Sequence, residues 1–280
     1  MRKGLVLPVV VACLLASCKE GKMQNVFSQD EEAEEDSLEA FMGDTLHLFE
    51  EDAPPVSVDE LFVDFFYSFA DDARFQNQRI SFPLSCKDGN EEMKLTRDDW
   101  MAYNRFTTQN IYSVIYEREH DLDLQKDTTV SSVGVEWIYL QEDYVEKFNF
   151  NRINGKWTLT DIEKELCSNL PNSNFLEFYA HFVSDSTFQR SSLATPVKLV
   201  LTSDEDENEA TEEHLSADDW FNMRHDLPLS SESLVNIDYG QACISQNRKT
   251  LLMEGVSNGL QMKLKFDKRS DGWKLIEIEY

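Results

Sequence analysis

The strongest constraint on the fold is that the second half of the chain repeats the first. Matching residues are Phe62, Phe65, Phe66, Phe69, Asp72, Phe75 and Gln76 in one copy, and Phe175, Phe178, Tyr179, Phe182, Asp185, Phe188 and Gln189 in the other. Further matches pair Pro83 with Pro196, Asp98-Asp99-Trp100 with Asp218-Asp219-Trp220, Phe150 with Phe266, and Trp157 with Trp273. So many matches in one order predict two copies of a single folding unit, over residues 58–168 and 169–280.

Each copy opens with a pattern typical of helices. The first four matched aromatic residues lie at i, i+3, i+4 and i+7, which places them on one helical face. Ser57 and Glu60 have the spacing of a capping box, so the first helix is expected to begin near Ser57. Thr96-x-x-Asp99 and Ser216-x-x-Asp219 predict a second, Trp-bearing helix in each copy by the same rule.

The rest of each copy is typical of strands. Short strands are expected around residues 83–86 and 197–202. Leu260, Met262, Leu264 and Phe266 alternate with polar residues, as in a half-buried strand. Asn154-Gly155 and Asp271-Gly272 predict hairpin turns, because glycine tolerates the positive φ that such turns need. Helices followed by a strand meander indicate the α+β class.

This order of elements resembles the nuclear transport factor 2-like (cystatin-like) fold, and the whole chain resembles bacterial lipoproteins of unknown function with two such halves. The resemblance covers about residues 58–280. It implies two tandem domains, each with an N-terminal helix pair packed on a curved antiparallel sheet. In that fold the sheet wraps the first helix into a cone with a pocket. Members of the fold include enzymes and binding proteins, so fold alone implies no activity.

The N-terminal residues have the features of a lipoprotein leader. A basic start, Arg2-Lys3, precedes a run of 12 apolar residues, 5–16, which is too short to span a membrane. Leu15-Ala16-Ser17-Cys18 resembles the lipobox of bacterial lipoproteins. The resemblance implies a signal peptide over residues 1–17 and a lipid on Cys18, which would anchor the protein to a membrane without spanning it.

Residues 18–57 are interpreted as the lipidated cysteine and an acidic tether. The acidic clusters at 30–36 and 50–52 and the following Pro54-Pro55 predict an extended segment, with partial order over 37–57. Lys19 follows the cysteine, and among lipoproteins a residue other than Asp there implies transfer to the outer membrane where the envelope has one. Whether the protein then faces the periplasm or the surface stays open.

Charge excludes one class of partner. The chain has 26 basic and 53 acidic residues and a net charge of −27, so it repels the phosphate backbones of nucleic acids. The membrane is then reached through the lipid on Cys18 rather than by electrostatics. The remaining partners are a small molecule, a glycan or an envelope protein.

The candidate site residues each have a structural alternative. Trp100, Trp157, Trp220 and Trp273 could stack on a ligand or fill the cores. The pairs Asp98-Asp99 and Asp218-Asp219 could act as acids and bases, or cap the helices that follow. Asp72 and Asp185 could face a cone pocket as general bases, or cap helix ends.

No other motif indicates catalysis or metal binding. Cys86, Cys167 and Cys243 do not occupy matching places in the two copies, so free thiols are expected rather than a disulfide in each domain. The acidic run 204–209 lacks the Gly and Glu that a calcium-binding EF-hand loop requires. The five His have no metal-site spacing, and we expect no cofactor. The first hypothesis is a non-catalytic binding module. The alternatives are an envelope hydrolase or isomerase that uses one cone pocket, and a structural spacer.

Overall fold

The structure is a computed structural model that describes residues 57–202, 210–256 and 258–280. These residues belong to one compact unit, Asp52–Tyr280. The predicted signal peptide, the lipidated Cys18, most of the tether and the acidic run lie outside the described residues. Within the described part, no helix is both long and apolar enough to cross a membrane.

The first half begins with two helices, continues with two strands and a third helix, and ends with four strands. Its helices are α1 (Phe62–Asp71), α2 (Ala73–Gln78) and α3 (Arg97–Tyr103), with short 3₁₀ helices η1 (Phe106–Thr108) and η2 (Glu119–Lys126). Its strands are β1 (Ile80–Asp88), β2 (Glu91–Leu95), β3 (Ile111–Tyr116), β4 (Ser132–Tyr139), β5 (Tyr144–Ile153) and β6 (Lys156–Leu166).

The second half repeats this order. Its helices are α4 (Ser173–Ser184), α5 (Ser186–Ser191) and α6 (Ala217–Met223), with 3₁₀ helices η3 (Cys167–Asn169) before α4 and η4 (Arg224–Asp226) after α6. Its strands are β7 (Leu193–Thr202), β8 (Ala210–Leu215), β9 (Ser233–Asp238), β10 (Arg248–Gly255), β11 (Gln261–Arg269) and β12 (Gly272–Glu279). The matched prolines Pro83 and Pro196 both follow cis peptide bonds. The two halves thus share their element order in detail.

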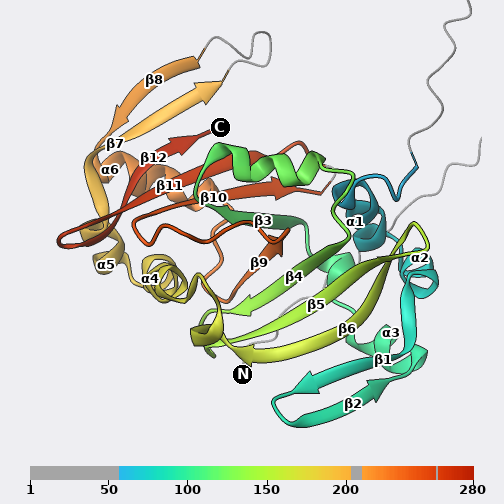
Figure 1. Cartoon of the computed structure of the whole chain (residues 1–280). Coiled ribbons are helices and arrows are strands. Elements are labelled where there is room, and N and C mark those ends of the chain that lie inside the picture. The colour runs from blue at the N-terminus through green and yellow to red at the C-terminus, as the bar shows by residue number, and fades with distance from the viewer. Residues whose placement is uncertain (1–56, 203–209, 257) are drawn as a thin grey trace, which may run out of the picture. The chain divides into compact units, whose positions relative to one another are not determined.

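The described strands form one 12-stranded sheet in the order β2-β1-β6-β5-β4-β9-β3-β10-β11-β12-β7-β8. The central strands β3 and β9 are exchanged between the halves. β4 pairs antiparallel with β9 of the other half, and β10 pairs antiparallel with β3 (Figure 1). β3 and β9 run parallel to each other and share one pair, Ser113 with Asn236.

This arrangement corrects the expectation of two separate antiparallel sheets. One sheet runs through both halves, and each half supplies a central strand to the other. The sheet is also mixed, because β1 and β6, and likewise β7 and β12, pair in parallel. The long connection from β1 to β6 and the short helices between them make parallel pairing geometrically accessible.

Two hydrophobic cores lie on opposite faces of the sheet. Val114 of β3 and Leu252 of β10 belong to the core that contains α1, while their chain neighbours Ile115 and Leu251 belong to the core that contains α4. Successive side chains of a strand point to opposite faces, so α1 and α4 cover opposite faces. The central strands are therefore buried on both sides, whereas outer strands such as β11 alternate between buried and half-buried residues.

Several local predictions are confirmed. The capping boxes of α3 and α6 are present. Asp99 accepts from the amide and hydroxyl of Thr96, and Asp219 accepts from the amide and hydroxyl of Ser216. The turn at Asn154-Gly155 joins β5 to β6 with positive φ at both residues. The turn at Gly272, also at positive φ, joins β11 to β12.

The predicted start of the first helix is wrong. Helix α1 begins at Phe62, and Leu61, the residue before it, offers no capping side chain. The segment from Ser57 to Glu60 forms a turn instead, in which the amide of Glu60 donates to the carbonyl of Ser57. The reason we infer is tertiary: Asp59 pairs with Arg79, which lies just before β1, and this contact competes with a helix in the same segment.

Candidate functional site

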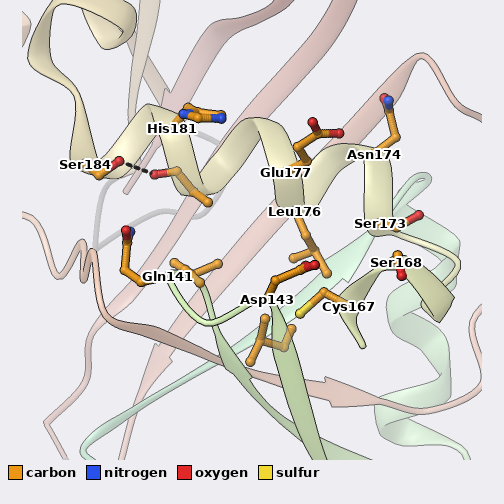
Figure 2. Close-up of a pocket in the computed structure, with 13 residues that line it drawn as sticks. Gln141, Asp143, Cys167, Ser168, Ser173, Asn174, Leu176, Glu177, His181 and Ser184 are labelled. Atoms are coloured by element: carbon orange, nitrogen blue, oxygen red, sulfur yellow. Dashed lines mark hydrogen bonds between the residues drawn. The ribbon is translucent and has the colours of Figure 1, made fainter. Parts of the chain in front are cut away.

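A surface groove runs between helix α4, the turn that joins β4 to β5, and η3 (Figure 2). We call it the α4 groove; its volume is about 560 Å³. It is lined by Ile138, Leu140, Gln141, Asp143, Cys167, Ser168, Ser173, Asn174, Leu176, Glu177, Ala180, His181 and Ser184. This volume falls within the range of small-molecule sites, about 300–1,000 Å³.

The periodicity of α4 creates one wall of the groove. Its aromatic residues, among them Phe175 and Phe182, are buried against the sheet. Asn174, Glu177 and His181 of α4 are exposed and line the groove, and the amide oxygen of Asn174 accepts from Lys268 and Trp273. Residues three and four apart lie on one helical face, so the packing of the aromatic residues fixes which polar residues face outward.

The floor of the groove is apolar. Ile138, Leu140, Cys167 and Leu176 are all buried there. The backbone amide of Cys167 donates to the carbonyl of Asp143 at 3.2 Å, which ties η3 to the β4–β5 turn. Asp143 adopts a positive φ of 55°, a conformation that Asp tolerates better than most residues. The floor and the turn thus form one connected surface opposite α4.

The rim is acidic, and the pKa of the thiol in the floor is raised. Asp143 and Glu177 are exposed at the rim, and none of the lining residues is Lys or Arg. Burial, together with the negative charge of Asp143, raises the pKa of the Cys167 thiol to about 11. A catalytic cysteine requires the opposite shift, toward a thiolate at neutral pH. The groove can therefore bind an apolar group beside a cation, but it does not activate its thiol.

The four tryptophans named from the sequence lie in the two cores. Trp157 and Trp220 are 0% exposed, Trp100 is 1% exposed and Trp273 is 6% exposed. The ring nitrogen of Trp100 donates to the buried Gln76 at 3.2 Å. None of the four lines the α4 groove. Their placement favours the core interpretation over stacking on a ligand.

The aspartates named from the sequence lie at helix starts. Asp99 and Asp219 belong to the capping boxes already described, and their partners lower the pKa of each carboxyl. Asp72 accepts from the amide of Arg74 as the N-cap of α2. Asp185 caps α5 in the same way. These contacts account for Asp72, Asp99, Asp185 and Asp219 as helix caps, whereas Asp218 pairs with Arg190 at 2.8 Å.

The three cysteines in the described residues are free. Cys86 and Cys167 are buried, and Cys243 is exposed. Within the described residues, no group of His, Cys, Asp and Glu has an arrangement that could hold a metal ion.

Sequence reasoning missed the α4 groove because its walls come from three separated segments. The only local signal was the polar face of α4, and a solvated face gives the same pattern. The β4–β5 turn meets that face because Tyr144, at the start of β5, pairs with Leu166, at the end of β6, and η3 and α4 follow β6 directly.

Comparisons with known proteins agree with the fold. A family model described as "Domain of unknown function (DUF4348)" matches residues 43–280. Among solved structures, the chain is similar to an NTF2-like protein from Bacteroides fragilis NCTC 9343, with a TM-score of 0.71 and 35% sequence identity. That match covers 81% of this chain and 98% of that chain. A search of curated proteins found no match.

Proposed function

The chain belongs to the family described as a domain of unknown function (DUF4348) and has an NTF2-like fold, so its role must be argued from its own residues. We propose that it is a non-catalytic binding module of the cell envelope, anchored by a lipid on Cys18. The observation that carries the binding role is the α4 groove, with its apolar floor and acidic rim. The raised pKa of the Cys167 thiol disfavours a thiolate nucleophile in this groove.

The groove is suited to a ligand with an apolar group beside a cation. Its buried floor, formed by residues such as Ile138 and Leu176, offers apolar contact, and burial of apolar surface drives association. Asp143 and Glu177 lie at the rim without a lysine or arginine among the lining residues, so they are placed to attract an amine. The net charge of −27 adds a long-range attraction for cations. A small amine or a basic peptide side chain next to an apolar one meets these requirements.

The binding proposal can be tested with two ligands that differ in one charge. Tryptamine carries an amine, and N-acetyltryptamine is its neutral counterpart. With the soluble chain 19–280, which keeps the whole compact unit, tryptamine should shift amide NMR signals within residues 138–143 and 173–184. Asp143→Asn and Glu177→Gln should each reduce tryptamine affinity about two- to fivefold, since exposed ion pairs contribute about 0–1 kcal/mol. Equal affinity for both ligands, or shifts confined to other regions, would refute it.

The anchor is proposed from the leader and Leu15-Ala16-Ser17-Cys18. Cells fed a radioactive fatty acid should label the wild-type protein and leave Cys18→Ala unlabelled. Label of equal strength on the variant would remove the anchor from the proposal without affecting the groove. The outer membrane is the proposed destination where the envelope has one.

We also infer that residues 58–168 and 169–280 descend from one duplicated segment. The matched residues and the repeated element order support this inference. The halves would then have diverged in role, because both the α4 groove and the cavity described next border α4 of the second half. On the other face, rings such as Phe62, Phe65 and Trp157 pack against one another, so the first half is suited to a scaffold.

A further inference from the structure

A second cavity, of about 310 Å³, lies where the exchanged strands β3 and β9 begin. We call it the seam cavity. It is lined by residues within 109–113 and 227–235, together with Tyr179 of α4 and Met253 of β10. It shares no lining residue with the α4 groove.

The strand exchange accounts for this cavity. β3 is paired along its length with β10, and β9 with β4, so each is held by a partner on its outer side. Between them, Ser113 and Asn236 are the one matched pair. Beyond that pair, the side chain of Asn236 accepts from the amide of Ile115 at 2.9 Å and so takes the place of a backbone partner. Toward the starts of β3 and β9, the described residues form no further pair between these two strands, and the cavity occupies this end.

The lining of the seam cavity is neutral. It contains no Asp, Glu, Lys, Arg or His. Ile111, Leu227, Leu234, Val235 and Met253 provide apolar surface, and the polar groups are hydroxyls and amides. A site without ionised groups is suited to uncharged molecules, because an ion would find no oppositely charged partner there.

Tyr179 provides an unused hydrogen-bond donor at this cavity. The residue is 1% exposed, and no described residue is a hydrogen-bond partner of its hydroxyl. Burial raises the pKa of Tyr179, so the hydroxyl stays protonated. The matching residue of the first half is Phe66, so a hydroxyl is not required at this position for packing. Buried polar groups are normally paired, and an unpaired one calls for an explanation.

We propose that the seam cavity binds a neutral, mainly apolar molecule whose single accepting oxygen, such as a ketone or ester carbonyl, accepts a hydrogen bond from Tyr179. The cavity volume suits a small ligand of this kind. This site is independent of the α4 groove and of the role proposed for it.

The test uses Prodan, a neutral naphthyl ketone whose emission shifts to the blue in apolar surroundings. Titrated into the soluble chain 19–280, it should give a saturable blue shift. Tyr179→Phe should weaken binding about five- to tenfold, the effect of losing one hydrogen bond. Leu229→Trp should fill the cavity and abolish the shift, whereas Ser184→Trp, placed in the α4 groove, should leave the dissociation constant unchanged within twofold. An anionic naphthalenesulfonate should bind at least tenfold more weakly.

Melting of the ligand-free protein separates this role from a structural one. Tyr179→Phe removes an unpaired buried hydroxyl, so its Tm should equal or exceed that of the wild type. A lower Tm would mean that the hydroxyl has a partner in the folded protein, which overturns the premise. Unchanged Prodan affinity in Tyr179→Phe, weakened binding in Ser184→Trp, or the lack of any saturable shift would each overturn the proposal.

Discussion

Removal of the Asp59 carboxylate should destabilise the protein far more than the loss of an exposed ion pair. Asp59 accepts from the two terminal nitrogens of Arg79 at 2.6 and 2.8 Å and from the backbone amide of Trp157 at 2.9 Å. The side chains of Asp59 and Arg79 are only 10% and 11% exposed. These contacts tie the segment before α1 to the start of β1 and to β6.

The expected cost of Asp59→Ala is about 3 kcal/mol. Breaking a buried pair by removing one partner costs about 3–5 kcal/mol, because the other charge is left unpaired. Arg79 keeps part of its environment, since it also donates to the carbonyl of Trp157 at 3.3 Å and lies 4.8 Å from the ring centroid of Phe75. The estimate therefore belongs at the lower end of that range.

The cost should depend on pH in a defined direction. Burial alone would raise the pKa of Asp59, but the hydrogen bonds from Arg79 and the Trp157 amide outweigh it and lower the pKa. A depressed folded-state pKa stabilises the protein above the unfolded value, about 3.9, and that contribution is lost as pH falls through the folded value. The difference between wild type and Asp59→Ala should thus be full at pH 7 and shrink below about pH 4.

Urea unfolding of the chain 19–280, followed by tryptophan fluorescence at pH 7 and pH 3, measures both quantities. The matched control is Lys87→Ala, which removes an ion pair to Glu163 whose side chains are 52% and 44% exposed. That control should cost at most about 1 kcal/mol. The reasoning is refuted if Asp59→Ala costs no more than Lys87→Ala, or if its cost is the same at both pH values.

Three further predictions follow from the exchange of strands, the tryptophan contacts and the burial of the thiols. Residues 57–168 expressed alone should not fold as a monomer, because β4 loses its pairing with β9. A monomeric mass in light scattering together with a folded near-UV circular dichroism spectrum would contradict this. Trp100→Phe should lower the free energy of unfolding in urea by about 1 kcal/mol more than Trp220→Phe does, since of these two ring nitrogens the described residues give a partner to that of Trp100 alone. Equal losses for the two variants would count against this. N-ethylmaleimide at pH 8 should label exposed Cys243 well before Cys167, whose pKa is about 11; mass spectrometry showing equal rates would be inconsistent with that burial.

The local features of the fold were predictable because they follow from neighbouring residues. The aromatic spacing at Phe62 and Phe175 predicts the buried faces of α1 and α4, and both helices have them. The capping boxes at Thr96 and Ser216 formed as expected because a cap involves residues only three apart. The box expected at Ser57 failed because an ion pair to Arg79, distant in sequence, competes for the same segment.

The candidate site was much less predictable. The aspartates at 99 and 219 have the capping role that their spacing allowed, and Trp100 and Trp220 are buried. The α4 groove and the seam cavity involve segments far apart in the chain, and no motif connects them.

The sequence by itself predicted two related halves and a strongly acidic chain, and it determined where α3 and α6 begin and where two hairpins turn. Only the tertiary structure decided that β3 and β9 change places and that α1 and α4 cover opposite faces of one sheet. The physical reason is that β-strands pair through backbone groups, which are the same in every residue, so the choice of partner depends on how both cores are filled at once.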